Sequence, residues 1–305
     1  MLLSSNSLRA ARPYLGTLVE ITIEADQGEG RDLHADLDAA FSAIERVHHL
    51  MSFHAADSDV SRINRAPAGI PVQIDAATYE VLQFAQQLSC HTEGMFDITI
   101  AAVLVAQGFL PRSAEGAQAV GRAISYRDLE LLSDHQVRWL EQGCIDLGGI
   151  AKGYAVDCAI AVLQQRGIGQ AMVNAGGDLR CIGRPQPIHI RHPDDPQMLI
   201  ALGELSNGAV ATSAGYYASR QEGQRMINPI VDPVQQCCLA WQSSISVVAA
   251  RCMMADALTK VVRLLVEDGS DRLSRLFAHF QAQAFMLDQR GLASLGSSCL
   301  FNLSE

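Results

Sequence analysis

The stretches DLGGIAKGYAVD at residues 146–157 and NAGGDL at residues 174–179 decide how the middle of this chain folds. The pattern predicts a short apolar strand over 144–147, a helix over 151–166 and a second strand over 171–174. A glycine pair lies at each end of this predicted helix-and-strand unit. The chain therefore brings two flexible backbone segments to the ends of one compact element pair.

The glycine pairs indicate a phosphate site. Glycine lets the backbone approach a ligand without a side chain in the way. Gly148 and Gly149 precede the predicted helix, whose first N–H groups and positive dipole end attract anions. Lys152 adds a mobile positive charge in the first turn. The alternative is a simple tight turn, because the stretch is neither a P-loop nor a GxGxxG dinucleotide fingerprint.

Length, composition and net charge restrict the classes of protein to which this chain can belong. The chain has 305 residues, of which 49% are hydrophobic and 18% charged, enough to bury a large core in one big domain or two small ones. The formal net charge is −10 and no Lys/Arg run occurs, which argues against a nucleic-acid partner. The acidic balance favours solubility rather than any particular substrate.

Cysteine usage and the N-terminus indicate a reducing compartment. The eight cysteines form no CxxC pair and no zinc-like spacing, and Cys158 and Cys252 are expected to be small core residues. No apolar run of signal-peptide length begins the chain, and no stretch of about 18 apolar residues is present to span a membrane. We expect a cytoplasmic protein, or one whose export signal is missing from this sequence.

Strands and helices interleave irregularly along the chain. Periodicity predicts helices over 33–51, 76–90 and 254–267, and strands over 17–24, 72–74, 137–140, 199–205, 209–213, 244–250 and 285–287. The strand over 137–140 is expected to pair with the one over 144–147. Asn207 and Gly208 form a strong hairpin signal, so the strands on either side of them are expected to pair. This order favours an α+β unit with two lobes over a doubly wound sheet.

Eight segments together resemble the flavin transferases of the ApbE type, the FAD:protein FMN transferases. They are LGTLVEITI at 15–23, MSFHAADSDVSRIN at 51–64, TEGMFDIT at 92–99, DLGGIAKGYAVD at 146–157, VNAGGDL at 173–179, ATSAGYY at 211–217, IVDP at 230–233 and SVVAARCMMADAL at 246–258. Each segment alone is a weak signal. Eight of them in the family's order are a specific one.

The resemblance implies a fold and an activity. The fold is α+β, of the T-fold-related, two-lobed ApbE architecture with mixed sheets and flanking helices, in a single domain over 1–305 with a core at about 14–265. The activity is Mg²⁺-assisted cleavage of the FAD pyrophosphate, with transfer of FMN to a Ser or Thr of a flavin-acceptor protein and release of AMP. The alternatives are a family member that binds FAD without transferring it, and an FAD pyrophosphatase that gives FMN and AMP.

The resemblance also implies the site residues. The Gly149 backbone oxygen and the Asp256 carboxylate would hold Mg²⁺, which prefers hard oxygen ligands. The FAD-binding residues would be Leu15, His54, Met95, Phe96, Asp97, Asp146, Lys152, Gly177 and Ile230. We predict Asp256 and Lys260 as the catalytic residues, Asp256 from the resemblance and Lys260 from a departure from the family pattern described below.

Four of these residues have simpler interpretations. Asp256 suits a helix N-cap, and Asp97 suits a turn. Lys152 suits a solvated surface position, because most lysines are exposed. Phe96 suits the core better than a stacking platform.

The chain departs from the family pattern at several positions. The family places a metal-ligating Thr four residues after the Asp of ADALST, where this chain has Lys260 and carries Thr259 one residue early. One residue is about 100° of helix, so Thr259 points elsewhere, whereas Lys260 shares a face with Asp256 and is placed to pair with it. Asn228 and Pro229 stand where the family has two histidines. The SGDY acid is replaced within Ser213–Tyr216, and His54 stands where an aromatic flavin-stacking residue is common.

These departures motivate one hypothesis about Lys260. Its ammonium would take the place of the metal and bind the FAD phosphates as a fixed cation, since an ammonium is a point charge that suits phosphate. It cannot act as a Lewis acid as Mg²⁺ does. The hypothesis predicts FAD binding with weak or metal-independent turnover. The alternative is that Lys260 extends to solvent and Mg²⁺ binds through Asp256 and Gly149.

Overall fold

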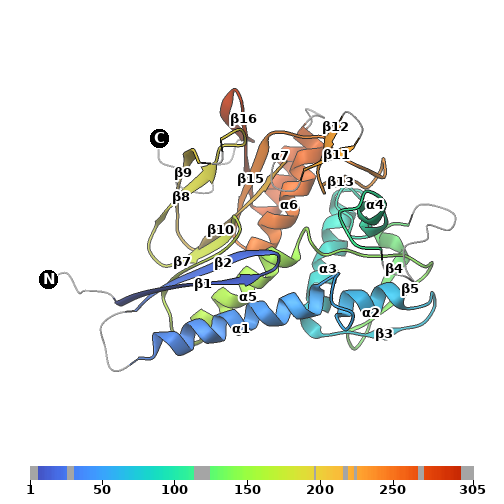
Figure 1. The fold of residues 1–305 in the computed structure, drawn as a ribbon, viewed down its shortest axis with the longest axis horizontal. Helices are drawn as coiled ribbons and strands as arrows, with labels where there is room; N and C mark the ends of the chain where they lie inside the picture. The colour runs from blue at the N-terminus through green and yellow to red at the C-terminus, as the bar shows by residue number, and fades with distance from the viewer. Residues whose placement is uncertain are drawn as a thin grey trace.

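An eight-stranded sheet forms the centre of the protein (Figure 1). The computed structural model describes residues 6–25, 31–112, 124–195, 197–215, 219–222, 225–266 and 271–296. In sheet order the strands are β1 (Asn6–Tyr14), β2 (Thr17–Ala25), β6 (Gln170–Ala175), β7 (Asp178–Ile182), β10 (Gly208–Ala214), β15 (Ser244–Ala249), β16 (Gln283–Asp288) and β17 (Gly291–Leu295).

Three long helices cover one face of this sheet (Figure 1). They are α1 (Leu33–Met51), α5 (Ala151–Gln165) and α6 (Cys252–Leu265), with α5 packed between the other two. Their apolar faces and the strands below them form the main core. Burying this much apolar surface fixes the relative positions of α5 and α6, the two helices that carry Lys152 and Lys260.

A second lobe and several hairpins complete the fold. The second lobe contains α2 (Asp59–Arg65), α3 (Ala76–His91), α4 (Ala101–Ala106), the 3₁₀ turn η1 (Tyr126–Asp128) and a small sheet of β3 (Val72–Gln73), β5 (Gln136–Trp139) and β4 (Leu129–Leu132). The hairpins are β8 (Gln186–Arg191) with β9 (Leu199–Leu205), β11 (Arg220–Glu222) with β12 (Arg225–Ile227), and β13 (Val231–Asp232) with β14 (Cys237–Cys238). Helix α7 (Asp271–Phe280) precedes β16.

The α+β class expected from the sequence is confirmed. In β2, the alternation places Val19, Ile21 and Ile23 in the core with no exposed surface. Every pairing among the described strands is antiparallel, so the expectation of mixed sheets was wrong. None of the described helices is both long and apolar enough to cross a bilayer.

The hairpin expected at Asn207 and Gly208 is absent. Asn207 does take a positive φ of 52°, as a turn residue does, but the chain changes sheets there. Strand β9 pairs with β8, whereas β10 pairs with β7 on one side and with β15 on the other. Because both edges of β10 are occupied in the central sheet, no edge remains for β9. The hairpin signal therefore identified the turn but not the partner.

The strand expected over 144–147 is also absent. The segment is buried and its backbone is satisfied by a side chain: the Ile145 N–H donates to Asn64 Oδ1 at 2.8 Å, and Asn64 Nδ2 donates to the Ile145 carbonyl at 2.9 Å. The Asn64 amide thus replaces a neighbouring strand. The expected partner, β5, pairs instead with β3 and β4.

Candidate functional site

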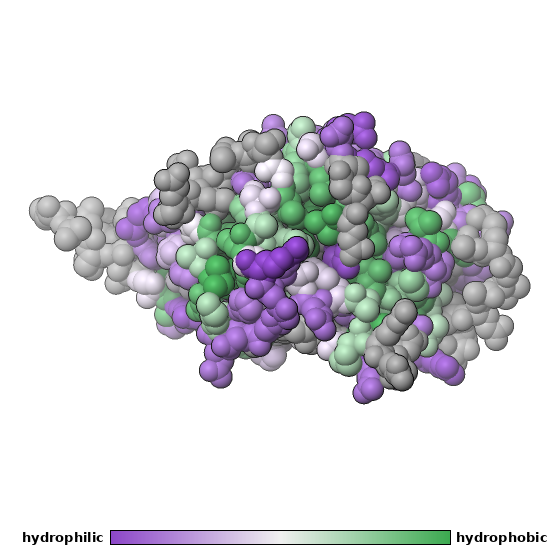
Figure 2. All heavy atoms as spheres, turned by 90° about the horizontal axis from the view of Figure 1, so that it is seen from above, coloured by the Kyte–Doolittle hydropathy of each residue, from purple (hydrophilic) through white to green (hydrophobic). Residues whose placement is uncertain are grey.

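A cleft of ≈ 1040 Å³ runs between the second lobe and the central sheet. This volume is at the upper end of the range of roughly 300–1,000 Å³ for small-molecule pockets. Figure 2 shows hydrophobic residues over much of one face of the molecule, with a strongly hydrophilic group among them near the middle and further hydrophilic residues at the edges. The cleft is lined by all nine expected cofactor-binding residues: Leu15, His54, Met95, Phe96, Asp97, Asp146, Lys152, Gly177 and Ile230.

The two glycine pairs have different roles. Gly148 and Gly149 lead into α5, and both line the cleft. Gly176 and Gly177 form the two-residue turn between β6 and β7, with φ of 66° and 105°. Positive φ at both positions explains why glycine is required in this turn. The turn places Asp178 at the start of β7, where it faces Lys152.

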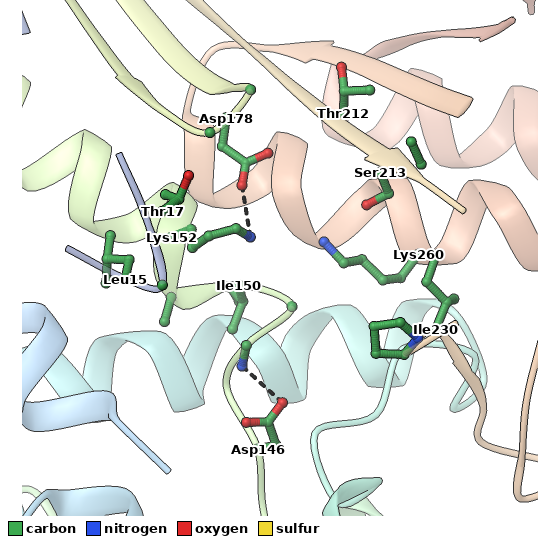
Figure 3. Close-up of a pocket in the computed structure, with 18 of the residues that line it drawn as sticks. Leu15, Thr17, Asp146, Ile150, Lys152, Asp178, Thr212, Ser213, Ile230 and Lys260 are labelled. Carbon is green, nitrogen blue, oxygen red and sulfur yellow. Dashed lines mark hydrogen bonds and ion pairs between the residues drawn. The ribbon is translucent and has the colours of Figure 1, made fainter. Parts of the chain in front are cut away.

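Lys152 forms an ion pair in the floor of the cleft (Figure 3). Its ammonium lies 2.8 Å from Asp178 Oδ2 and 3.6 Å from Asp256 Oδ2. Burial lowers the pKa of Lys152, but the carboxylates of Asp178 and Asp256 outweigh this and raise its pKa above the ordinary value. Lys152 is therefore charged at neutral pH, and the alternative of a solvated surface lysine is wrong.

Asp256 lies beneath the two lysines with no exposed surface. Its Oδ2 accepts the Gly153 N–H at 3.1 Å, and its Oδ1 pairs with the Lys260 ammonium. Burial raises the pKa of Asp256, but the ammonium groups of Lys152 and Lys260 overcome this and hold its pKa below the ordinary value. Asp256 does not cap its own helix; it caps an N–H in the first turn of α5, a role that the alternative of a local N-cap did not foresee.

Lys260 points into the cleft from α6 (Figure 3). Its ammonium also donates to the Asp256 carbonyl at 2.9 Å, so the expected pairing of the two residues is confirmed. A Cβ built on Gly149 would lie only 3.3 Å from Lys260 Cε, which shows that the lysine stem passes directly beside the Gly149 backbone. Thr259 points away, as predicted: its hydroxyl contacts Ser213 Oγ at 2.7 Å and donates to the Asp256 carbonyl at 2.7 Å.

The Mg²⁺ ion implied by the resemblance does not fit these residues as they are arranged. Mg²⁺ needs open oxygen ligands in near-octahedral geometry. Both Asp256 oxygens already have N–H or ammonium partners, and the Lys260 stem lies beside Gly149. Within the described ranges, no three His, Cys, Asp or Glu side chains are placed to hold a metal. A divalent ion would enter here only if Lys260 moved away.

Asp157 holds the start of α6 in place from the neighbouring helix. Its carboxylate accepts the N–H groups of Cys252 and Met253 at 2.9 and 3.0 Å, and it forms an ion pair with Arg180 at 2.7 Å. Helix α6 has no side-chain cap from its own N-cap residue. A residue of α5 therefore supplies the cap of the helix that carries Asp256 and Lys260.

We expect Asp157→Ala to lower the free energy of unfolding by about 3 kcal/mol, because it removes a cap and leaves Arg180 without its buried partner. Asp32→Ala is the matched control, since Asp32 caps α1 locally at an exposed position. That control should cost about 1 kcal/mol. Urea unfolding of both variants measures the difference. Equal losses in the free energy of unfolding would show that a cap supplied by a neighbouring helix stabilises the protein no more than a local cap does.

The remaining expected residues take structural as well as lining positions. Asp97 Oδ1 accepts the Thr99 N–H at 2.8 Å, which is the turn role given as its alternative. Phe96 is 5% exposed and belongs to the main core, as its alternative proposed, although it also lines the cleft. Burial raises the pKa of Asp146, whose Oδ2 accepts the Gly148 N–H at 3.1 Å. Cys252 is buried and Cys158 half-buried, close to the expected core positions.

The positions where the resemblance implies histidines, Asn228 and Pro229, also build the cleft. Asn228 is 2% exposed, and its side chain bonds to the backbone of Trp241 and Ile230. Pro229 lines the cleft next to Ile230. Both therefore shape the wall rather than present a titratable group. Tyr216, which ends the departure from the family's SGDY, lies outside the described residues.

Sequence reasoning missed several residues of the site. Asp178 was visible as the last residue of GGD, but its partner Lys152 is on another element. Thr212 and Ser213 come to the cleft because β10 is central, and the β8–β9 hairpin contributes Ile190. Leu15 lines the cleft at a φ of 55°, a strained value for a branched side chain and a common mark of a functional site.

Comparison with known proteins assigns this architecture. A model described as the ApbE family matches residues 15–284. The FAD:protein FMN transferase of Rhodobacter capsulatus is 28% identical over 273 residues, covering 85% of this chain but only 51% of that protein. The FAD:protein FMN transferase of Vibrio cholerae is 26% identical over 272 residues, covering 84% of this chain and 80% of that protein. This chain thus spans about half the length of the first relative.

Solved structures agree with this match. The ApbE protein of Thermotoga maritima superposes with a TM-score of 0.83 at 24% identity, covering 95% of this chain and 97% of that one. The flavin transferase ApbE of Vibrio cholerae gives a TM-score of 0.81 at 25% identity, covering 99% of this chain and all (100%) of that one. The family match spans most of the sequence, including both helices that carry the lysines. This chain belongs to the ApbE family.

Proposed function

We propose that this chain is an FAD:protein FMN transferase. It would cleave the FAD pyrophosphate, transfer FMN to a Ser or Thr of an acceptor protein and release AMP. The observation that carries the proposal is the pair of ammonium groups of Lys152 and Lys260 in the floor of a large cleft. The names of its relatives in Rhodobacter capsulatus and Vibrio cholerae support the same activity.

The arrangement suits pyrophosphate chemistry. In the transfer, an acceptor hydroxyl oxygen bonds to the FMN phosphorus while the bond from that phosphorus to the bridging oxygen of AMP breaks, AMP leaves with that oxygen, and the hydroxyl proton is released to solvent. Negative charge grows on the phosphate oxygens and on the departing AMP. Preorganised cations beside those oxygens stabilise this charge more than that of the ground state. Lys152 and Lys260 are held for this by Asp178 and Asp256, whose carboxylates fix the ammonium positions.

The cleft walls suit the two ends of a dinucleotide. Apolar side chains from the β1–β2 turn, the loop after α3 and the segment before β13 offer surfaces for flat rings, represented by Leu15, Met95 and Ile230. We propose that these residues, with His54 and Asp97, line the flavin and adenosine positions. We further propose that residues 1–305 act as one domain, because the main core draws on elements from β2 to β16. The cytoplasmic location stays a prediction.

The competing functions are separated by one experiment. FAD is incubated with the protein and a flavin-acceptor protein, with Mg²⁺ or with EDTA, and the products are resolved by liquid chromatography and intact-protein mass spectrometry. FMN attached to the acceptor with an equal amount of AMP supports the transferase. Free FMN with AMP would instead indicate a pyrophosphatase, and intact bound FAD a protein that only holds the flavin.

We expect Lys152→Met to lower the rate of FMN transfer by about 100-fold, in the range found when one charge-stabilising donor is removed. Methionine keeps the apolar stem but removes the charge. The rate of FMN attachment to the acceptor is measured at saturating FAD, with Arg46→Met as the control, since Arg46 pairs with Asp75 at an exposed position. An unchanged rate would show that Lys152 does not act on the phosphates.

A further inference from the structure

The chain contains two lysines, and both lie in the cleft. Of its 23 lysine and arginine residues, only Lys152 and Lys260 are lysines. Both line the cleft, from two different helices. An ammonium is a compact point charge with three donors, whereas a guanidinium presents a broad planar fork. The two lysines therefore offer small cations where close contact with phosphate oxygens is needed.

Asp256 holds the two lysines close together through its two carboxylate oxygens. One of its oxygens pairs with Lys260 and the other lies 3.6 Å from the Lys152 ammonium. Figure 3 shows the two ammonium groups pointing toward each other across the floor of the cleft. With Asp178 beside Lys152, two carboxylates face two ammonium groups. The mutual repulsion of the lysines is thus offset, and the pair stays in place.

The position of Lys260 leaves one ligand of the implied metal engaged and places the lysine stem beside the other. Its stem passes beside Gly149, and its ammonium holds one oxygen of Asp256. The only hydroxyl at this point of the helix, that of Thr259, is turned to Ser213 on β10. Of the two metal ligands that the resemblance implies, Asp256 is therefore paired with the chain's own cation, and Gly149 lies beside the stem of the same lysine.

We propose that Lys152 and Lys260 together bind the pyrophosphate of metal-free FAD, with Lys260 acting in place of a divalent cation. The identity of the dinucleotide rests on the proposed function. Each ammonium donates to non-bridging phosphate oxygens while its carboxylate partner stays beneath it. The substrate of this chain is then FAD itself and not its Mg²⁺ complex.

Metal binding tests the role of Lys260 without any flavin. Binding of Mn²⁺ is followed by electron paramagnetic resonance on wild type, Lys260→Thr and Arg290→Thr, the last being a surface control whose partner is Asp288. Threonine removes the cation and returns an oxygen to the helix position. We expect wild type and Arg290→Thr to leave Mn²⁺ free at concentrations where Lys260→Thr binds one ion. Equal binding by wild type and Lys260→Thr would overturn the proposal.

The affinity of the protein for FAD also tests whether Lys260 acts in place of a divalent cation. Wild type should bind FAD equally well in EDTA and in Mg²⁺. Lys260→Met, which keeps the stem and supplies no oxygen, should lose at least about tenfold in affinity, because a charge-assisted hydrogen bond is lost. Added Mg²⁺ should not restore it. A wild-type affinity that depends on Mg²⁺ would overturn the proposal even if Lys260→Thr failed to fold.

The scarcity of lysine allows both ammonium groups to be observed directly. Reductive methylation with ¹³C-formaldehyde retains the charge and labels only Lys152, Lys260 and the α-amino group. In EDTA, FAD should shift both lysine signals in the NMR spectrum, whereas riboflavin, which has no phosphate, should shift neither. FAD binding that moves neither lysine signal would overturn the proposal. Failure of FAD to bind under any condition would count against the proposed function instead, and the Mn²⁺ comparison would still report on Lys260.

Discussion

Gly153→Ala is expected to separate α5 from α6 and to lower the free energy of unfolding by about 3 kcal/mol. A Cβ at Gly153 would lie 2.3 Å from the Cys252 carbonyl oxygen and 2.7 Å from the Met253 nitrogen. These are backbone atoms, so no side-chain rotation relieves the overlap. The helices must move apart, and the roughly 1 kcal/mol by which alanine favours a helix over glycine does not offset this cost.

The same change should damage the site. The Gly153 N–H donates to Asp256 at 3.1 Å, and Asp157, one turn later, caps the start of α6. Separation of the helices weakens all of these contacts, and Lys152 and Lys260 then lose their spacing. We therefore expect FAD affinity to fall together with stability.

Gly169→Ala provides the control for this prediction. A Cβ at Gly169 meets no atom within 4 Å, and the φ of Gly169 is not positive. Its free energy of unfolding should stay the same or rise slightly, since alanine restricts the unfolded chain. Urea unfolding and flavin fluorescence titration measure both variants. Wild-type values for Gly153→Ala would contradict the close packing of the two helices.

Asp256→Asn should have the second large effect. The change keeps the shape of the side chain but leaves Lys152 and Lys260 without the carboxylate between them. Removing one partner from a buried ion pair typically costs about 3–5 kcal/mol. Lys260 keeps some contact with solvent and Lys152 keeps Asp178, so we expect the lower end of this range. FMN transfer should fall by at least about 100-fold, because the cations are no longer held in register.

The pH dependence of stability should report the same contact. The pKa of Asp256 is lowered in the folded protein from its ordinary value of 3.8. A carboxylate with a lowered pKa contributes stability that is fully present above its unfolded pKa and is lost as the pH falls through the folded one. The difference between wild type and Asp256→Asn should therefore be constant from about pH 5 to 8 and shrink below about pH 4.

Chemical denaturation at several pH values measures this difference. Asp288→Asn is the control, since Asp288 pairs with Arg290 on the surface and should leave stability and transfer unchanged. A difference between wild type and Asp256→Asn that persisted undiminished at acid pH would mean that the charge of Asp256 is not what stabilises the site.

Local pattern was sufficient for the elements whose burial is regular. The period of α1 and the alternation of β2 follow directly from which side chains must face the core. The spacing of Asp256 and Lys260 by four residues was sufficient to predict their contact, because one helical turn brings them together. The motifs also identified the nine expected cofactor-binding residues that line the cleft. They were identified together because the resemblance to the family rests on several matching segments at once.

Pairing between distant segments could not be read in this way. The signal at Asn207 and Gly208 described a turn, but the partner of β10 depends on which sheet edges are already occupied. Nothing near residues 144–147 in the sequence shows that the Asn64 amide would replace a strand there. Each outcome is a competition among segments far apart in the chain.

The sequence by itself determined the family, the helix that carries Lys152 and the presence of Lys260 where the resemblance implies a ligand threonine. Only the tertiary structure decided that Asp178 and Asp256 bracket Lys152 and that Asp157 caps the neighbouring helix. The physical reason is that local periodicity reports which face of an element is buried. The partner that a charged group finds inside depends on how separate elements pack, and a buried charge has to find one.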